Sequence, residues 1–362
     1  MQTPILSYIK LSISRAREGH LPLYRQLGEM LYLQLRFRIG PGFYHRARFW
    51  RREMPFRQKT RYRLGQPYLD ALASINHPRY ETLSQNKVCE KAMLTLFGIP
   101  TAPFMGCFHP LWGRSCDGQP LTSSAQLWAL LQRKQQQAVA FKRPVGARGI
   151  GFDLIDIGSG EDQEIFSRAL QRSLPLDEYL QLKGEEYGDQ GIHIEALIQQ
   201  HPAMAALNPS SVNTLRLWVR QTERDIQVRS GVLKVGSRTS LADFNLEKAG
   251  GLYAPIDLAT GTLREVHVRP GPPEERVDPA VLDGFVIPFW PRAVQLAKEC
   301  LAVFPETRLV GMDIAIAPDG PLIVELNNQP DPIHAANVDI PTLDLIGSQS
   351  PTSALGRPQR QG

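Results

Sequence analysis

Two carboxylates and an amide late in the chain have the types and spacing of a site for a hard metal cation. The segment LVGMDIAIAPDGPLIVELNNQPD, residues 309–331, reads as two alternating strands around a Pro-Asp-Gly turn at 318–320. A hairpin centred on the aspartate of that turn places Asp313 opposite Glu325, about 5 Å apart at Cβ. Asn327 shares the side of Glu325 because side chains alternate along a strand. Mg²⁺ prefers such carboxylate oxygens together with substrate phosphates.

Two alternatives compete with the metal interpretation: one carboxylate points to solvent, or a bulge breaks the register. The flanking Ile314, Ile316, Leu322, Val324 and Leu326 are typical of a buried sheet and argue against a solvated face.

A glycine-rich hairpin is the second candidate for chemistry. VAFKRPVGARGIGFDLIDI, residues 139–157, has a lysine at the end of an apolar strand, a glycine loop and another alternating strand. No helix follows the glycines, so neither a P-loop nor a Rossmann fingerprint is present. Glycines let backbone N–H groups approach phosphate oxygens, and the basic side chains would add charge. The predicted phosphate-binding residues are Lys142, Gly146, Arg148, Gly149 and Gly151. The competing interpretation is a mobile hairpin with a solvated lysine.

Two further predicted strands each carry a basic residue among apolar ones. In residues 213–220 Arg216 shares one face with Thr214 and Trp218, and in residues 231–235 Lys234 opposes its apolar neighbours. Transfer of a phosphoryl group requires neutralisation of charge around the phosphates. Arg216 and Lys234 are therefore candidates to contact a γ-phosphate or an acyl phosphate, and ordinary surface charges are the alternative.

These residues need elements to position them. Apolar periodicity predicts helices at 21–39, which the Gly-Pro-Gly at 40–42 ends, and at 84–97, 124–136 and 289–303. Residues 107–122 read as a loop. Alternation predicts strands at 139–144, 152–157, 192–198, 213–220, 227–235, 308–317 and 321–327.

The net charge of +5 over 362 residues is unevenly distributed. Residues 14–63 hold thirteen Arg and Lys against three Glu, a balance of +10, so the rest of the chain sums to −5. In residues 43–63 aromatic residues alternate with arginines. This pattern fits contact with an anionic polymer, a nucleic acid or a lipid surface through residues 36–63. It also fits a helix whose aromatics pack inward while its arginines face water, and no nucleic-acid motif accompanies it.

Composition limits the remaining classes. No apolar run approaches the ~18 residues of a membrane span, and the N-terminus reads as no secretory signal. Four scattered cysteines make no disulfide framework. Cys107, His109 and Cys116 lack the second pair that a zinc site needs, so ordinary thiols in a reducing cytoplasm are expected. The polar segment from Ser348 has the composition of a disordered tail.

In combination the motifs resemble the ATP-grasp superfamily. FKRPVGARGIG looks like its phosphate loop, IEALIQQHP like its hinge, and MDIAI with VELNN like its magnesium set. SQNKVCEKAMLTLFGIPTAP looks like the earlier lysine helix. The sequences QHP, NTLR and Gly250-Gly251 are similar to the sugar-transfer-associated ATP-grasp family, which includes alpha-L-glutamate ligase-like proteins. The resemblance covers residues 77–340.

The resemblance implies a role for individual residues. Lys87 joins Lys142 as a phosphate-facing lysine, Glu195 contacts adenine, and the backbone near Ala196 and Ile198 completes the hinge. A ribose-binding acid is missing after the hinge glutamate, and His201 is a substitute or else a packing or capping histidine. Asp243 and Asn245 would hold an incoming amine or hydroxyl. The implied metal ligands are Asp313, Glu325 and Asn327, with ATP and two Mg²⁺ ions as cofactors.

The implied fold is α/β of the α+β kind: two subdomains that grip ATP between antiparallel sheets. The expected divisions are a basic helical extension at 1–76, an associated lobe at 77–137, a central subdomain at 138–205, a C-terminal subdomain at 206–345 and a tail at 346–362. The implied activity is an ADP-forming carboxylate–amine ligase acting on small molecules linked to a glycan or its precursor. A kinase acting on a hydroxyl, and a non-catalytic scaffold that docks through the basic segment, are the alternatives.

Overall fold

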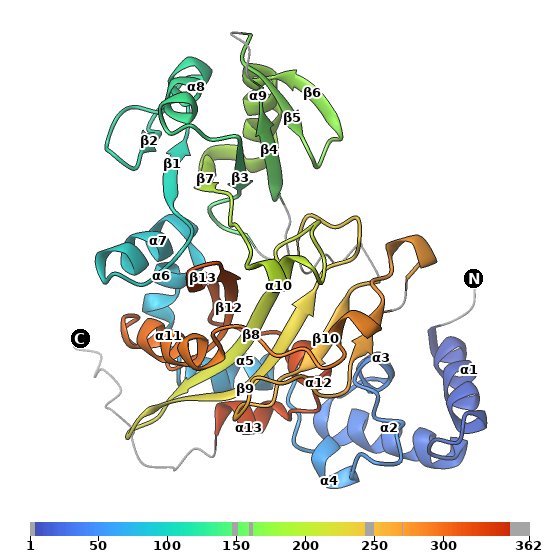
Figure 1. The fold of residues 1–362 in the computed structure, drawn as a ribbon. Helices are drawn as coiled ribbons and strands as arrows, with labels where there is room; N and C mark the ends of the chain where they lie inside the picture. Colours follow the sequence, from blue (N-terminus) through green and yellow to red (C-terminus); the bar gives the residue numbers. More distant parts are fainter. Residues whose placement is uncertain (1–3, 147–150, 159–161, 243–249, 270, 348–362) are drawn as a thin grey trace. The chain divides into compact units, whose positions relative to one another are not determined.

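The computed structural model describes residues 4–146, 151–158, 162–242, 250–269 and 271–347, with side chains from residue 6 onward. The chain divides into two compact units (Figure 1). Unit 1 combines Met1–Ile75 with Gln329–Gly362, and unit 2 is Asn76–Asn328.

The first sheet of unit 2 is antiparallel and holds seven strands in the described ranges, in the order β2-β1-β7-β3-β4-β5-β6. The strands are β1 Phe104–Phe108, β2 Arg114–Ser115, β3 Ala138–Lys142, β4 Asp153–Ile157, β5 Glu164–Ser167, β6 Arg172–Pro175 and β7 Ile192–Ala196. β2 and the end of β1 lie where the sequence predicted a loop, because glycine and polar residues hid their short alternation. β3 and β4 form the predicted glycine hairpin, with Phe141 paired to Asp153.

Two amphipathic helices pack on this sheet, α8 (Ser124–Arg133) and α9 (Leu176–Tyr187). Leu127, Leu131 and Tyr179 join β-strand residues such as Phe141 and Ile194 in one apolar core. Figure 1 shows α9 beside β4, β5 and β6.

The second sheet, again antiparallel, runs β11-β10-β9-β8-β12-β13 through the described residues. Its strands are β8 Thr214–Gln221, β9 Ile226–Val235, β10 Leu252–Pro255, β11 His267–Val268, β12 Leu309–Ala317 and β13 Gly320–Asn327. Helix α11 (Trp290–Ala302) packs across β8, β9, β12 and β13 and closes the larger core. The strands predicted at 213–220, 227–235, 308–317 and 321–327 are confirmed.

Short helices complete unit 2. They are α6 Glu81–Gln85, α7 Lys87–Leu96 and α10 Pro202–Ala205, with 3₁₀ turns at Pro78–Tyr80, Gly188–Gln190, Pro273–Glu275 and Pro279–Leu282. Asn86 caps α7, because its side chain accepts hydrogen bonds from the N–H groups of Val88 and Cys89. The helix predicted at 84–97 therefore begins at Lys87, which places that lysine in the first turn.

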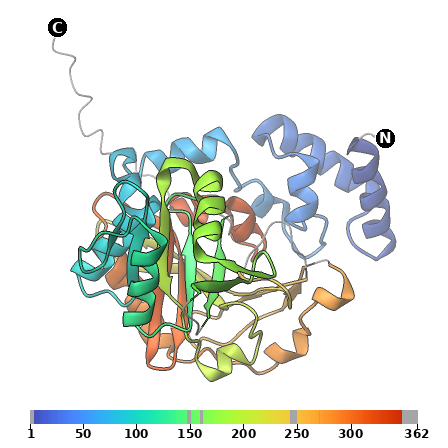
Figure 2. The same ribbon diagram turned by 90° about the horizontal axis from the view of Figure 1, so that it is seen from above.

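Unit 1 is helical. Its helices are α1 Pro4–Arg17, α2 Leu23–Phe37, α3 Pro41–Arg46, α4 Phe56–Lys59, α5 Gln66–Ala73, α12 Pro332–Ala336 and α13 Thr342–Ile346. Figure 2 shows α1 and α2, in dark blue, side by side. The helix predicted at 21–39 ends at Phe37, where Arg38 adopts a left-handed conformation (φ 57°). The Gly-Pro-Gly sequence does not stop α2, since Gly40 instead precedes α3 with Pro41 in its first turn.

The aromatic–arginine segment 43–63 folds as α3, α4 and connecting turns rather than as one helix. Its aromatics are buried in the core of unit 1: Phe43, Tyr44, Phe49, Trp50 and Tyr62. Arg46, Arg52, Arg57 and Arg61 are exposed. The inward packing of these five aromatics is confirmed, whereas Phe56 is half-buried, and the arginines just named lie on the surface of this segment.

Candidate functional site

Four neighbouring strands of the second sheet present charged side chains on one face. The order β9-β8-β12-β13 pairs Lys234 with Thr214, Arg216 with Asp313, and Asp313 with Glu325. Directly paired residues point to the same side of a sheet, as do residues two apart on one strand. The sheet register therefore lines up two cations and two carboxylates across four strands.

Asp313 is the centre of this row. Its Oδ1 accepts from Arg216 Nε at 2.6 Å and its Oδ2 from Arg216 Nη2 at 2.7 Å. Lys234 Nζ lies 3.0 Å from Oδ1. All three residues are buried. Burial by itself would raise the pKa of Asp313, but Arg216 and Lys234 hold it below the usual value, so the carboxylate stays ionised. The alternative that Arg216 and Lys234 are surface charges is wrong.

The pairing of Asp313 with Glu325 is confirmed, but it depends on a bulge. Next to the turn the pairs are Ala317 with Gly320 and Ala315 with Leu322, a register that would place Val324 opposite Asp313. A one-residue shift after Ile314 moves Glu325 into that position. The bulge, one of the alternatives to a metal site, thus brings the two carboxylates opposite each other.

Glu325 is less tightly held than Asp313. Lys87 Nζ lies 3.5 Å from Glu325 Oε2. Asn327 donates through its amide nitrogen to Glu325 Oε1 and to the Gly311 carbonyl, both at 3.3 Å. The amide oxygen of Asn327 is then the atom that can accept a cation.

A second charged cluster surrounds Glu195 on β7. Lys142 Nζ from β3 lies 2.6 Å from Oε2, His193 Nε2 lies 2.7 Å from Oε1, and Lys91 Nζ from α7 lies 3.4 Å from Oε1. Glu195 and Lys91 are each 1% exposed. Burial would raise the pKa of Glu195, but Lys142, Lys91 and His193 hold it well below the usual range. Burial lowers the pKa of His193 to about 4, so this imidazole is neutral at pH 7.

Helix α7 joins the two clusters. Lys87 and Lys91 are four residues apart and project from one side of the helix. Lys87 reaches Glu325 and donates to the Gly146 carbonyl at 3.3 Å. Lys91 reaches Glu195, and it also donates to Thr101 Oγ1 and to the Val324 carbonyl of β13 at 3.4 Å. One helix therefore fixes side chains from both sheets.

Glu90 adds a buried carboxyl beside these lysines. Its Oε1 accepts from the Leu326 N–H at 2.5 Å. Burial raises the pKa of Glu90 to about 8, in spite of Lys91 and Lys87 nearby. Sequence analysis missed Glu90, Lys91 and His193. The i, i+3 and i+4 spacing from Lys87 in a predicted helix was the available signal for the first two.

The glycine loop is anchored at both ends. Val145 pairs with Asn86 in an isolated bridge, and the Lys87 N–H donates to the Pro144 carbonyl. Gly151 has φ +73°, and Tyr187 donates from its hydroxyl to the Gly151 carbonyl. A Cβ at Gly151 would lie 2.7 Å from the Arg143 side chain. The predicted Arg148 and Gly149 lie outside the described residues.

The hinge segment follows β7. Ala196 ends β7, where it pairs with Val139 of β3 and its N–H donates to the Pro103 carbonyl at 3.0 Å, and Ile198 follows the strand. His201 caps α10, because its Nδ1 accepts from the Ala203 N–H at 3.2 Å. The capping alternative for His201 is therefore observed, and the structure does not bring it to the charged clusters by any described contact.

The remaining motif residues are structural. Asn213 is buried, and its amide donates to the Met204 and Asn208 carbonyls. Gly250 has φ +92°, and a Cβ on Gly251 would lie 2.5 Å from the Val235 carbonyl. Asp243 and Asn245, predicted to hold an acceptor, lie outside the described residues.

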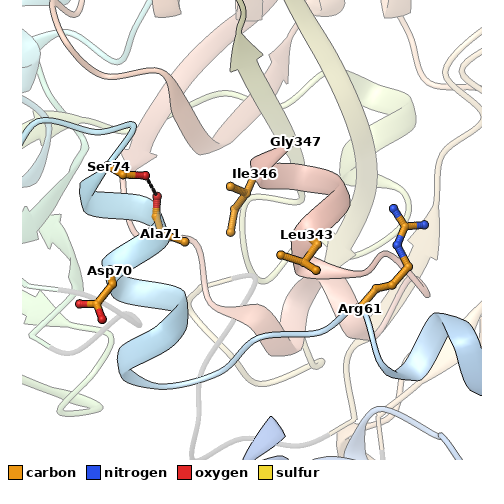
Figure 3. Close-up of a pocket in the computed structure, with 7 residues that line it drawn as sticks. All are labelled: Arg61, Asp70, Ala71, Ser74, Leu343, Ile346 and Gly347. Atoms are coloured by element: carbon orange, nitrogen blue, oxygen red, sulfur yellow. Dashed lines mark hydrogen bonds between the residues drawn. The ribbon is translucent and has the colours of Figure 1, made fainter. Parts of the chain in front are cut away.

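A hollow of about 590 Å³ lies elsewhere, in unit 1 between α5 and α13 (Figure 3). Its polar groups are engaged: Arg61 pairs with Asp344, and the Ser74 hydroxyl donates to the Ala71 carbonyl at 2.6 Å. No predicted site residue lines it. Ligand sites combine a few convergent polar groups with titratable residues of shifted pKa, and the charged clusters of unit 2 have both.

Two features are absent from the described part of the chain. No three His, Cys, Asp or Glu side chains lie close enough together to hold a metal ion, Cys107 and Cys116 included. None of its helices is long and apolar enough to cross a membrane.

Comparison with protein families supplies the decisive observation. Residues 166–339 match the model described as sugar-transfer associated ATP-grasp. This part of the chain belongs to the sugar-transfer-associated ATP-grasp family. The matched region contains Glu195, both cations of the second sheet and the residues Asp313 to Asn327. The ATP-grasp fold expected from the sequence, with paired antiparallel sheets and flanking helices, is confirmed.

Solved structures resemble this ATP-grasp chain only distantly. Biotin carboxylase from Campylobacter jejuni is 11% identical (TM-score 0.45), with coverage of 75% of this chain and 48% of that one. D-alanyl-alanine synthetase A from Vibrio cholerae is 10% identical (TM-score 0.41), at 70% and 58%. N5-carboxyaminoimidazole synthase from Aspergillus clavatus is 15% identical (TM-score 0.39), at 75% and 57%. The chain spans less than two thirds of the length of these proteins. A search of curated proteins gave no match.

Proposed function

We propose that this chain is an ATP- and Mg²⁺-dependent carboxylate–amine ligase that forms an amide and releases ADP. The observation that carries the proposal is the bridging of the two charged clusters by α7, since Lys87 contacts Glu325 and Lys91 contacts Glu195. Lysines of both clusters and the carboxylates of the second sheet converge as phosphoryl transfer requires.

The residues present fit a magnesium nucleotide. Asp313, Glu325 and Asn327 offer the hard oxygens that Mg²⁺ prefers. Bound ATP supplies a phosphoryl group that activates the substrate carboxylate as an acyl phosphate, from which the amine displaces inorganic phosphate. Glu325 is the more available ligand, because Arg216 occupies both oxygens of Asp313. The number of Mg²⁺ ions, expected to be two, can be counted by titration.

The side chains of the protein prepare this site before any substrate binds. Glu195 fixes Lys142 at the mouth of the glycine loop, where a point charge attracts phosphate oxygens. Arg216 and Lys234 neutralise Asp313, and they are the cations closest to the proposed metal ligands. Displacement of Arg216 toward a phosphate would free Oδ2 of Asp313 for the metal, because Lys234 contacts Oδ1.

The proposal also covers the kind of substrate and the cellular location. The family description supports a substrate linked to a sugar or glycan precursor. A small-molecule acid and amine fit a site built for phosphoryl chemistry rather than for a polymer. All four cysteines are free thiols, which favours a reducing, cytoplasmic location.

Thermal unfolding with and without ATP and Mg²⁺ tests nucleotide binding. Ligand at a hundred times its dissociation constant should stabilise the wild type by ~2.7 kcal/mol. Glu325→Ala should lose the part of this stabilisation that depends on Mg²⁺. Asp319→Ala is the matched control, because this carboxylate lies in the turn of the same hairpin and is exposed. Equal Mg²⁺-dependent shifts in all three proteins would contradict the metal assignment.

Product analysis then separates the reaction classes. A ligase forms ADP, phosphate and an amide from paired acids and amines. ADP with a phosphorylated hydroxyl would identify a kinase instead, and nucleotide binding without turnover on any acceptor would indicate a scaffold.

A further inference from the structure

Helix α2 of unit 1 carries apolar side chains on the face that points away from the core. The exposed fractions are 79% for Tyr24, 62% for Leu31, 49% for Tyr32 and 76% for Leu35, with Leu27 at 37%. The opposite face, which packs on the core, consists of Gln26, Glu29, Met30 and Leu33. The periodic leucines Leu27, Leu31 and Leu35 of this helix thus lie outside the core.

The exposed side chains form one stripe. Positions 24, 27, 31 and 35 recur at three- and four-residue spacing, so they line a single side of α2 for three turns. Surface helices of soluble proteins carry polar residues on this side. Phe56 of α4 extends the stripe, because its ring meets the ring of Tyr32 edge-on with centroids 5.5 Å apart.

Basic side chains surround the C-terminal end of the stripe. Arg36 and Arg38 end α2 and are exposed, and Arg57 follows Phe56. None of these three forms a salt bridge with a residue that the structure describes. Arg63 adds a fourth guanidinium, 4.9 Å from the ring centroid of Phe37.

Acidic side chains do little to offset this charge. Of the three glutamates in residues 14–63, Glu18 pairs with Arg15, and Glu53 is exposed next to Arg52 in the sequence. Glu29 is buried, where it pairs with Lys59 and accepts from the Tyr44 hydroxyl. The surface around the stripe is therefore both apolar and strongly positive.

We propose that this stripe and its arginines dock the protein on an anionic lipid surface. Leucine and tyrosine side chains enter the boundary between headgroups and acyl chains, while guanidinium groups bind lipid phosphates bidentately. A nucleic acid fits the charge but leaves aliphatic leucines without an acyl phase to enter. A neutral apolar partner fits the leucines but leaves the arginines without counter-charges. An anionic bilayer satisfies both.

Co-sedimentation of the full chain with vesicles tests the proposal. The wild type should bind vesicles of equal parts phosphatidylglycerol and phosphatidylcholine, and bind pure phosphatidylcholine weakly. Arg36→Gln with Arg38→Gln should weaken binding roughly thirtyfold, the usual loss for two basic side chains at an anionic surface. Leu31→Gln with Leu35→Gln should weaken it at any salt concentration, whereas raising the salt should weaken the electrostatic part alone.

The control is Leu96→Gln, since Leu96 is 75% exposed at the end of α7 in unit 2 and lies outside the stripe. It should bind vesicles as the wild type does. Binding that both double variants retain, or equal binding to neutral and anionic vesicles, would overturn the proposal. Failure of the wild type to bind vesicles would also overturn it. If the wild type is then a dimer in solution, and Leu31→Gln with Leu35→Gln dissociates that dimer, a second copy of the chain covers the stripe.

Discussion

The candidate site in unit 2 and helix α2 in unit 1 break the usual rule of burial in opposite directions. In unit 2, Glu195, Lys91, Asp313 and Lys234 are at most 4% exposed. In unit 1, Leu31 and Leu35 are 62% and 76% exposed. Buried charge and an exposed apolar patch are the two informative departures from ordinary burial. The difference between the regions is that each buried charge has a partner inside the protein, whereas the leucines of the stripe stay exposed.

That difference indicates what offsets the free-energy cost of the buried charges and of the exposed apolar side chains. A buried charge is tolerated when opposite charges and hydrogen bonds replace water, as Arg216 and Lys234 do for Asp313. Apolar side chains that stay exposed add little to the stability of the fold. We therefore expect them to be buried against a surface outside the chain. This contrast agrees with the two proposals, a small ligand at the charged clusters of unit 2 and a lipid surface at α2.

The largest expected effect is the loss of a buried pair. Arg216→Met should lower the free energy of unfolding by about 3 kcal/mol, the low end of the range for breaking such pairs, because Lys234 remains beside Asp313. Urea unfolding measures this. Arg220→Met is the matched control, four residues along the same face of β8, half-buried and bonded to the Arg308 carbonyl. An equal decrease in the free energy of unfolding in both variants would show that the ion pair with Asp313 adds no stability beyond that of an ordinary arginine of this strand.

A smaller effect concerns the pH dependence of stability through Glu90. Burial raises its pKa to about 8 in the folded protein, against the reference value of 4.5. Its stabilising contribution is therefore complete below pH 4.5 and is lost as the pH rises through 8, since the folded state holds the proton more tightly. Glu90→Gln keeps an acceptor for the Leu326 N–H and cannot ionise.

The stability of the wild type relative to Glu90→Gln should thus fall between pH 5 and pH 9. Each unit of the pKa shift corresponds to about 1.4 kcal/mol, so a fall of at least that size is expected. Thermal unfolding of both proteins over this pH range supplies the measurement. Parallel pH profiles would mean that Glu90 titrates normally and that its burial is compensated by Lys87 and Lys91.

The smallest expected effect concerns the exposed stripe of α2. Leu31→Gln should change the free energy of unfolding by less than about 0.5 kcal/mol, because an exposed side chain contributes little to folding. Leu33→Ala, on the buried face of the same helix, should cost about 2–5 kcal/mol. Urea unfolding of the full chain measures the free energy of unfolding of both variants. A large cost at Leu31 would place the stripe within a core and remove the basis for lipid docking.

Much of the site could be predicted because its residues are local in sequence. Lys142 before the glycine loop, Glu195 in a strand and the Asp313, Glu325, Asn327 set each lie in a periodic segment that fixes which side they face. Lys91 was missed because its role depends on contacts between elements. Lys91 joins Glu195 to the Val324 carbonyl, 129 residues apart, and no periodicity records such a meeting. His193 lies two residues from Glu195 on one strand, where alternation could have indicated it.

The fold shows the same division. Four strands of the second sheet, β8, β9, β12 and β13, were predicted closely, since each is long and alternating. The short β10 and β11 were not predicted. The segment Gln329–Gly362 belongs with the N-terminal helices in unit 1, and nothing in its composition indicated that. Tyr68, for example, donates to the Pro330 carbonyl, a contact that only folding reveals.

The sequence by itself determined the chemical inventory: a lysine beside a glycine loop, a late pair of carboxylates, the antiparallel strands that carry them, and the concentration of arginine near the N-terminus. Tertiary structure decided the rest, because pairing and burial are set by contacts between distant segments. It inserted the bulge that brings Glu325 opposite Asp313. It gave Asp313 its two cations. It also turned the periodic leucines of α2 outward, since a helix with apolar residues on two faces folds with whichever face its neighbours can cover.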